Sequence, residues 1–186
     1  MRISTLQENK IDLKSYMKEF KNHHLRFATV DDASSIVDLQ IRGWKHSYQG
    51  IIDQAYLDSI CQTKRLQGRL EHMAKAISWT FVVEHEHKII GVCDIGPART
   101  PEFGRGEIYA MYVDKDHHRQ GVGGMLWNAA FEKLKRENLS PVIIIALSKN
   151  FQAQNFYKKM GGIICAEIQT PIGSKLYDEI VFRYEC

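Results

Sequence analysis

Apolar and polar positions along the chain change their period several times, and each change predicts an element. A short apolar stretch over residues 25–28 predicts a strand. Residues 33–44 then repeat apolar positions at helical spacing, and Asp31 or Asp32 just before them is expected to cap the helix. The N-terminal part of the chain thus begins with a strand and a helix.

The middle of the chain is expected to contain further helices and then three strands. Residues 47–60 predict a turn followed by a second helix, and residues 62–77 predict more helix. The apolar runs of residues 79–96 are interrupted by a polar turn near His85–His87, which indicates two strands joined by that turn. Residues 106–113, GEIYAMYV, predict a third strand.

The last part of the chain alternates helix and strand. Residues 141–147 are continuously apolar, as in a strand buried on both faces. Residues 150–162 predict a helix that ends at glycine, and residues 162–170 and 175–184 predict a final hairpin. The helix before these elements presents one apolar face, made of Val122, Met125, Leu126, Ala129 and Leu134.

This order of elements predicts the fold class. The strand over residues 106–113, the helix after it and the strand over 141–147 form a unit whose strands should be parallel. Short turns should make the other strands antiparallel. We therefore expect an α/β (α+β) fold with a mixed, mostly antiparallel sheet, a central parallel pair and flanking helices. Residues 1–24 are polar and lysine-rich and are expected to form an arm or appended helix outside a domain over residues 25–186.

Composition narrows the classes of function. A length of 186 residues with 44% apolar and 25% charged residues suits one globular domain. The formal net charge of +3 does not indicate a nucleic-acid partner, and no apolar run is long enough for a membrane span. Four cysteines without CxxC spacing predict no metal site and no disulfide framework. We expect buried free thiols at Cys93 and Cys165, and a cytoplasmic protein.

A glycine-rich turn, HRQGVGG at residues 118–124, lies between a predicted strand and a predicted helix. Glycines let backbone amides approach a ligand, and the N–H groups at a helix N-terminus suit phosphate. The turn matches neither the P-loop GxxxxGK[ST] nor the dinucleotide motif GxGxxG. From these residues alone, a phosphate cradle and a plain strand-to-helix turn are equally open.

The turn resembles the pyrophosphate loop of the GNAT superfamily of acyl-CoA-dependent N-acetyltransferases, which reads (Gln/Arg)-x-x-Gly-x-(Gly/Ala). Gly121 and Gly123 match this pattern, whereas His118 stands where Gln or Arg is usual. Residues 150–161 are similar to the family's N-x-x-A-x-x-F-Y-x-x-x-G segment. The resemblance covers roughly residues 25–184 by pattern matching. It implies a GNAT-type sheet whose central parallel pair is splayed to bind acyl-CoA.

The resemblance also implies where acetyl-CoA, the expected co-substrate, binds. Acetyl-CoA would lie in a V between the strand ending at Val113 and the strand over residues 142–147. Its pantetheine arm would follow Met111, Tyr112 and Val113, and the amide of Met111 would donate to the thioester oxygen. Asn150 would hydrogen-bond the ligand, cap its own helix, or do both. The pyrophosphate would be held by the loop amides of Arg119, Gln120, Gly121, Val122, Gly123 and Gly124, and His118 at the first position of the motif would also bind the cofactor.

Two catalytic residues follow from the same resemblance. Tyr157 matches the general acid, because a tyrosine with a pKa near ~10 is protonated when a thiolate with a pKa near ~8.5 departs. Its alternative is a core aromatic residue beside Phe156. Glu107 is expected to act through water as the base, and its alternative is a strand-edge charge facing solvent. Tyr109 is a second polar candidate on that strand.

The acceptor is expected to be a primary amine of a small molecule or peptide, acetylated by direct transfer. Carboxylates of Glu102, Glu107 and Asp53 would attract a cationic amine such as a polyamine. His46 and Tyr48 would line the acceptor pocket or lie in a surface loop. A catalytically silent CoA-binding module and a protein N-terminal acetyltransferase remain alternative functions. Dimers are common among similar folds, which leaves a homodimer open.

Overall fold

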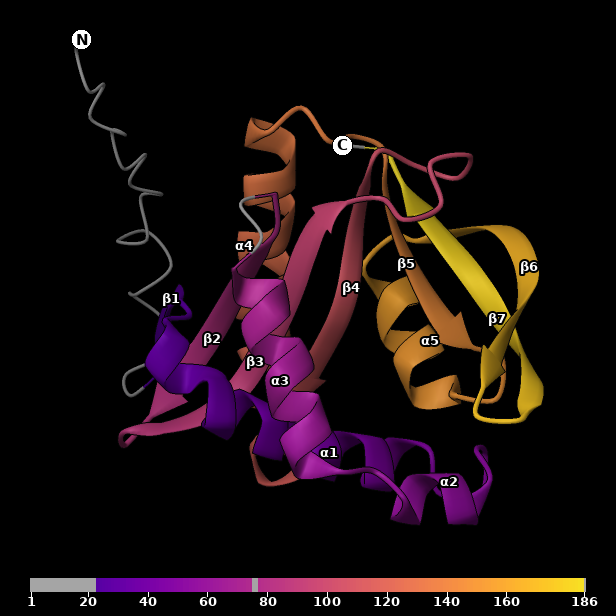
Figure 1. Cartoon of the computed structure of the whole chain (residues 1–186). Coiled ribbons are helices and arrows are strands. Elements are labelled where there is room, and N and C mark those ends of the chain that lie inside the picture. Colours follow the sequence, from indigo (N-terminus) through magenta and orange to yellow (C-terminus); the bar gives the residue numbers. More distant parts are fainter. Residues whose placement is uncertain (1–22, 75–76, 186) are drawn as a thin grey trace, which may run out of the picture.

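The computed structural model describes residues 23–74 and 77–185, which contain one seven-stranded sheet (Figure 1). The strands lie in the order β1-β2-β3-β4-β5-β7-β6. Only the β4–β5 pair is parallel among the neighbouring strands of this sheet. The predicted mixed sheet with a central parallel pair is therefore confirmed. The strands are β1 (His24–Phe27), β2 (Trp79–His85), β3 (Lys88–Pro97), β4 (Gly106–Val113), β5 (Val142–Leu147), β6 (Ile163–Ile172) and β7 (Lys175–Tyr184).

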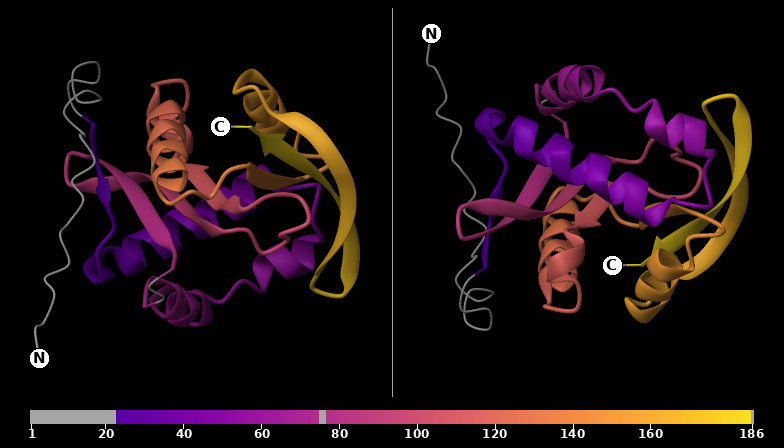
Figure 2. Two further views of the ribbon diagram at one scale, coloured as in Figure 1. Left: turned by 90° about the horizontal axis from the view of Figure 1, so that it is seen from above. Right: turned by 90° about the horizontal axis from the view of Figure 1, so that it is seen from below.

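Helices cover both faces of the sheet. Figure 2 shows α1, α2 and α3 on one face and α4 and α5 on the other. Two short 3-10 turns, over Val30–Asp32 and Lys115–His117, precede α1 and α4. The helices are α1 (Ala33–Ser47), α2 (Gln54–Asp58), α3 (Gln62–Met73), α4 (Val122–Arg136) and α5 (Phe151–Lys159).

The core follows the two-residue period of the strands. On β2, Phe81 and Val83 belong to the large apolar cluster under α4, whereas Val82 between them packs with Ile36 and Leu39 of α1. All five side chains are fully buried or nearly so. Both faces of the central strands are therefore dry, which explains their nearly continuous apolar sequence.

Several predictions need correction or lie outside the described residues. Cys93 is buried as expected, but Cys165 is exposed, because β6 is the edge strand and no helix in the described part of the chain covers its outer face. The helix predicted over residues 62–77 ends at Met73. The predicted arm lies outside the described residues up to position 22. Within the described ranges, no helix is long and apolar enough to cross a bilayer.

Candidate active site

The two parallel strands separate partway along their length (Figure 1). The β4–β5 pairing ends at Ile108. β4 also bulges there: Ile108 pairs with Ile95 of β3 and Ala110 pairs with Asp94, so Tyr109 is the extra residue. Beyond the bulge, the edge of β4 faces a gap instead of β5.

Backbone groups of β4 point into this gap. The N–H of Asp114 donates to the carbonyl of Ile90 on β3 at 2.7 Å, and hydrogen bonding alternates in direction along an antiparallel strand. The N–H groups of Met111 and Val113 therefore point away from β3 and toward the gap. His118 Nε2 lies 3.1 Å from the carbonyl oxygen of Val113, which places the ring of His118 at the same edge.

The glycine-rich turn forms the entrance to α4. Gly121 has a φ of +85°, a left-handed conformation that glycine adopts without strain. No side chain of the described residues caps the helix that begins at Val122, so its first N–H groups remain available to an acceptor. A Cβ on Gly124 would meet nothing within 4 Å, and one on Gly123 would first meet Phe156 at 3.6 Å. The turn thus leaves open space around donor-rich backbone.

Asn150 is the N-cap of α5. Its side-chain oxygen accepts a hydrogen bond from the N–H of Ala153 at 3.2 Å. The structure therefore shows the capping role, while a contact between Asn150 and acetyl-CoA stays a prediction.

Tyr157 lies on α5 inside an aromatic cluster. Its side chain is 7% exposed and packs with Trp127, Phe156 and Phe182. Burial raises the pKa of its hydroxyl well above the usual range, and Tyr48 adds to this shift. Tyr157 is therefore both a core aromatic residue and a protonated hydroxyl at neutral pH.

Glu107 is fully buried and bound to Arg99, which differs from a strand-edge charge facing solvent. Its Oε2 accepts a hydrogen bond from the backbone N–H of Arg99 at 2.8 Å. Its Oε1 accepts from the guanidinium of Arg99, with Nε at 3.1 Å and Nη2 in close contact. The guanidinium also lies 5.0 Å from the ring centre of Tyr109, whose hydroxyl donates to the carbonyl of Pro97 at 2.6 Å. Both polar residues proposed from the sequence of β4 are thus already engaged.

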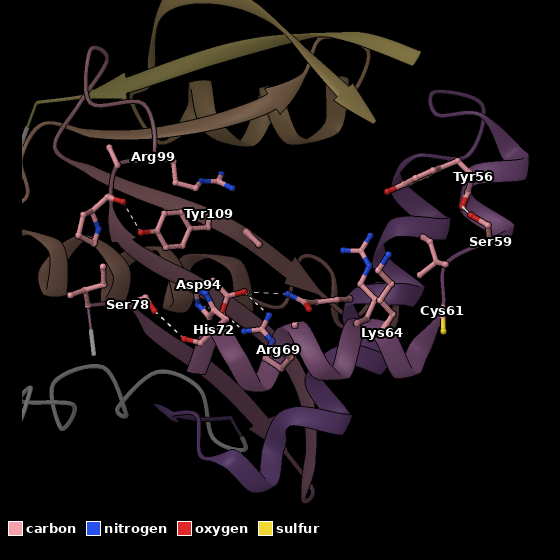
Figure 3. Close-up of a pocket in the computed structure, with 18 residues that line it drawn as sticks. Tyr56, Ser59, Cys61, Lys64, Arg69, His72, Ser78, Asp94, Arg99 and Tyr109 are labelled. Carbon is pink, nitrogen blue, oxygen red and sulfur yellow. Dashed lines mark hydrogen bonds and ion pairs between the residues drawn. The ribbon is translucent and has the colours of Figure 1, made fainter. Parts of the chain in front are cut away.

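An open cavity of about 1000 Å³ lies between α3, the loop after β3 and the bulged part of β4 (Figure 3). Arg99 and Tyr109 lie at one end of the cavity and Lys64 and Tyr56 at the other. Ala110, directly after the bulge, lines it as well. The cavity therefore opens onto the part of β4 where the two parallel strands separate.

The floor of this cavity contains a buried ion pair that the sequence analysis did not identify. Arg69 of α3 binds Asp94 of β3 with both nitrogens, at 2.6 and 2.7 Å. Asp94 also accepts hydrogen bonds from Thr80 at 2.7 Å and from Gln40 at 3.2 Å, and His72 Nε2 lies 3.8 Å from its carboxylate. An aspartate in the apolar run GVCDIG was the one available signal, since its partners lie 14 to 54 positions away in the chain.

The acidic residues expected to attract a cationic amine do not line the cavity. Glu102 is exposed on its loop. Asp53 caps α2, accepting from the N–H of Ala55 at 2.9 Å, and forms an ion pair with Lys175 at 2.5 Å. Neither His46 nor Tyr48 lines the cavity either. Tyr48 is instead hydrogen-bonded to Tyr112 of β4.

The family model described as Acetyltransferase (GNAT) family matches residues 44–162, more than half of the chain. The chain is 27% identical over 128 residues to the uncharacterized N-acetyltransferase YuaI of Bacillus subtilis, covering 68% of this chain and 72% of that protein. It is 29% identical over 141 residues to a probable N-acetyltransferase of Mycobacterium tuberculosis, covering 74% of this chain and 78% of that protein.

A solved structure with the same fold is yncA from Salmonella typhimurium, described as a putative acetyltransferase with its cofactor acetyl-CoA. The TM-score is 0.67 at 16% sequence identity, and the match covers 88% of this chain and 94% of that chain. At this identity, the likeness supports the fold alone.

Proposed function

The chain belongs to the GNAT acetyltransferase family, and from that premise we propose that it transfers an acetyl group directly from acetyl-CoA to a primary amine of a small molecule or peptide. The gap between β4 and β5 carries this proposal. Met111 and Val113 direct backbone N–H groups into that gap, and both side chains pack against the cluster that contains Tyr157. The backbone donors that could bind a thioester and the hydroxyl that could protonate a leaving thiolate thus lie in the same region of the molecule.

The residues of this region fit acetyl-CoA. The free edge of β4 offers a strand to which the pantetheine arm can add, and the turn at Gly121 offers backbone donors for the pyrophosphate. When bound, acetyl-CoA supplies the acetyl group as a reactive thioester. Membership of the GNAT acetyltransferase family supports this choice of co-substrate, and yncA, which shares the fold, was solved with acetyl-CoA.

Two groups of this chain are proposed to act on the thioester. The N–H of Met111 donates to the thioester oxygen, where negative charge develops during attack. Tyr157 donates its proton to the departing sulfur, and its burial keeps that proton in place until then.

The amine must also lose a proton, and two side chains are candidates for the base. We propose Glu107, acting through water, although both of its oxygens accept hydrogen bonds from Arg99. His72 is a second candidate for the base, because it lines the cavity and lies beside the Asp94 carboxylate. His72 would act directly on an amine held at the end of the cavity near β4, whereas Glu107, which is buried and does not line the cavity, would need the intervening water.

The proposal is tested by CoA-thiol release from acetyl-CoA with a panel of small amines and short peptides. We expect turnover of at least one small amine above the rate without acceptor. A rise in melting temperature with acetyl-CoA but no thiol release with any amine would instead indicate a silent CoA-binding module. Turnover of peptides alone would favour a protein N-terminal acetyltransferase.

A further inference from the structure

We propose that the acceptor amine also carries an anionic group, a carboxylate or a phosphate, which Lys64 and Arg65 of α3 bind inside the cavity. This inference rests on the proposed acetyl transfer and names the class of acceptor for the same site. It replaces the expectation of a polyamine, which assumed carboxylates around the acceptor.

The charges that line the cavity are mostly positive. Among the described residues, four cationic side chains line it: Lys64, Arg65, Arg69 and Arg99. Asp94 is the one carboxylate among the same lining residues, and Arg69 already binds it with two nitrogens. Arg99 is likewise paired with Glu107, behind the cavity wall. Two cations therefore remain without a compensating carboxylate.

Lys64 and Arg65 are those two cations. Neither side chain forms an ion pair with any residue in the described ranges. The guanidinium of Arg65 lies 4.7 Å from the ring centre of Trp44, which holds it in position. Its charge also reaches Tyr112 of β4, where burial raises the pKa of the hydroxyl and Arg65 lowers it. Arg65 is exposed, and the contact with Trp44 holds its guanidinium at the cavity wall.

The positions of these cations suit an elongated acceptor that carries an amine at one end and an anionic group at the other. The amine has to reach β4 next to Tyr109 and Ala110, where the parallel strands separate. Lys64 lies toward the opposite end of the cavity (Figure 3). A molecule that spans this length would place its amine at β4 and its anionic group at α3.

The same charges disfavour a cationic tail. A second ammonium group would enter a cavity with no unpaired carboxylate among its described lining residues, so it would lose hydration without gaining an ion pair. Positive charges around the reacting amine also favour its neutral form, which is the nucleophile. Glu179 on β7 is a nearby negative charge. Burial and hydrogen bonding dominate the pKa shifts of Tyr48 and Arg99, and the charge of Glu179 adds a smaller increase to both. Because Glu179 does not line the cavity, it leaves Lys64 and Arg65 uncompensated.

Matched pairs of amines test this inference by binding as well as by turnover. Isothermal titration into the CoA-loaded protein uses amines long enough to span the cavity: it compares 8-aminooctanoate with 8-aminooctanamide, and 6-aminohexyl phosphate with 6-aminohexanol. We expect at least one anionic member to bind roughly tenfold to a hundredfold more tightly than its neutral partner. The first pair measures the effect of a carboxylate and the second that of a phosphate, so the experiment shows which of the two anionic groups is bound.

The variant K64Q/R65Q should abolish this preference and leave the affinity for the neutral amines within about twofold. K88Q serves as the control, because Lys88 is exposed at the start of β3 and does not line the cavity. A melting curve with and without acetyl-CoA checks that each variant is folded. Equal binding within both pairs, or a preference that survives in K64Q/R65Q, would overturn the inference.

Turnover separates this inference from the proposed function. If the anionic amines bind preferentially but no amine releases CoA thiol from acetyl-CoA, the proposed transfer fails while the anion site stands. If neutral or cationic amines turn over best, with no loss in K64Q/R65Q, the transfer stands and the anion site fails.

Discussion

The hydroxyl of Tyr157 lies in an apolar environment that opposes its ionisation, and this sets what the residue can do. Its ring stacks on Trp127 and its hydroxyl has a raised pKa because of burial. Such a hydroxyl stays protonated at neutral pH, so it has a proton to donate to a leaving thiolate, although the raised pKa makes it a weaker acid than a free tyrosine. The same packing makes it a structural residue, so a test has to separate the two roles.

Tyr157→Phe separates them because it removes the proton donor and keeps the ring. We expect turnover to fall by roughly 10²- to 10⁴-fold, while the acetyl-CoA-induced rise in melting temperature is retained. Tyr184→Phe is the structural control: Tyr184 also packs on Trp127, and its hydroxyl donates to the backbone carbonyl of Tyr157 at 2.9 Å, so this variant measures what the loss of a buried hydroxyl beside α5 does to turnover. Wild-type turnover in Tyr157→Phe would assign the residue to the core alone.

The base is tested by comparing Glu107→Gln with His72→Gln. We expect Glu107→Gln to lower kcat/KM by roughly 10²-fold or more, and His72→Gln to leave it within about threefold. The pH dependence of kcat/KM gives a second readout, because replacement of the base removes its limb of the profile. A larger loss in His72→Gln, together with a missing limb, would transfer the role to His72.

At the scale of elements, the turn before α4 must both change the direction of the backbone and leave the first N–H groups of the helix accessible. Gly121 supplies the left-handed backbone that ends the loop, and Gly123 and Gly124 keep the first helical turn free of side chains. Glycine is a weak helix former, so this first turn gives up local stability. The open donors that result suit a pyrophosphate.

Gly123→Val tests this use of the turn. A β-branched side chain there would occupy the space above the first N–H groups of α4, where a Cβ has Phe156 as its nearest neighbour. We expect the acetyl-CoA-induced rise in melting temperature to be lost. Gly68→Val is the control, because a Cβ at this position of α3 meets nothing within 4 Å. An undiminished thermal shift in Gly123→Val would contradict the pyrophosphate cradle.

The entry to α1 depends on an ion pair between β1 and the 3-10 turn. Arg26 binds both oxygens of Asp32, at 2.7 and 2.9 Å, and Asp32 also accepts from the N–H of Thr29 at 2.7 Å. The hydrogen bond from Arg26, followed by that from Thr29, lowers the pKa of Asp32 to about 2 despite opposing burial. Asp32 thus lies before α1 as expected, but its carboxylate holds Arg26 and Thr29 and does not cap α1 by a side-chain hydrogen bond.

This shift predicts a pH dependence of stability. Because the pKa of Asp32 is lower in the folded state, its stabilisation is complete above the unfolded value of 3.8 and is lost as the pH falls through about 2. Asp32→Asn should lower the free energy of unfolding at neutral pH by about 1–2 kcal/mol, and the difference should shrink below pH 4. Urea unfolding at several pH values measures it, with exposed Asp31→Asn as the control. A deficit that is constant with pH would exclude the ion pair as its cause.

At the scale of the whole molecule, a buried ion pair joins the α3 wall of the cavity to the sheet. Arg69 is 7% exposed and Asp94 is 4% exposed, and their pair joins α3 to β3. Most side chains of α3 are exposed, and among the described residues of this helix Arg69 is the one that is buried. This pair therefore helps to hold the wall that carries Lys64 and Arg65, together with the contacts of α3 with α1.

Arg69→Met should destabilise the protein by about 3–5 kcal/mol, because it leaves the buried carboxylate of Asp94 without its cation. Arg69→Met/Asp94→Leu should recover part of that loss, since both charges are removed. Lys64→Met, an exposed position on the same helix, is the control and should change stability by less than about 0.5 kcal/mol. The free energy of unfolding in urea gives all three values. If the double variant is no more stable than Arg69→Met, the unpaired charge of Asp94 is not the cause of the loss of stability.

The sequence by itself determined the order of the elements, the parallel β4–β5 pair and the family. These features follow from short-range patterns: the apolar run of β2, the helical apolar face of α4, the spacing of Gly121 and Gly123, and the separate spacing of Asn150 and Tyr157. They depend on neighbours a few residues apart, which a sequence records directly.

Only the tertiary structure decided how the side chains of the cavity are paired. Arg99 engages Glu107, Arg69 engages Asp94, and Asp53 is occupied by Lys175 across 122 positions. Whether a carboxylate is free to meet an amine depends on which cation lies within a few ångströms, and that contact is created by folding. The sequence could name the charged residues, but the fold chose their partners and left Lys64 and Arg65 without a carboxylate among the described residues.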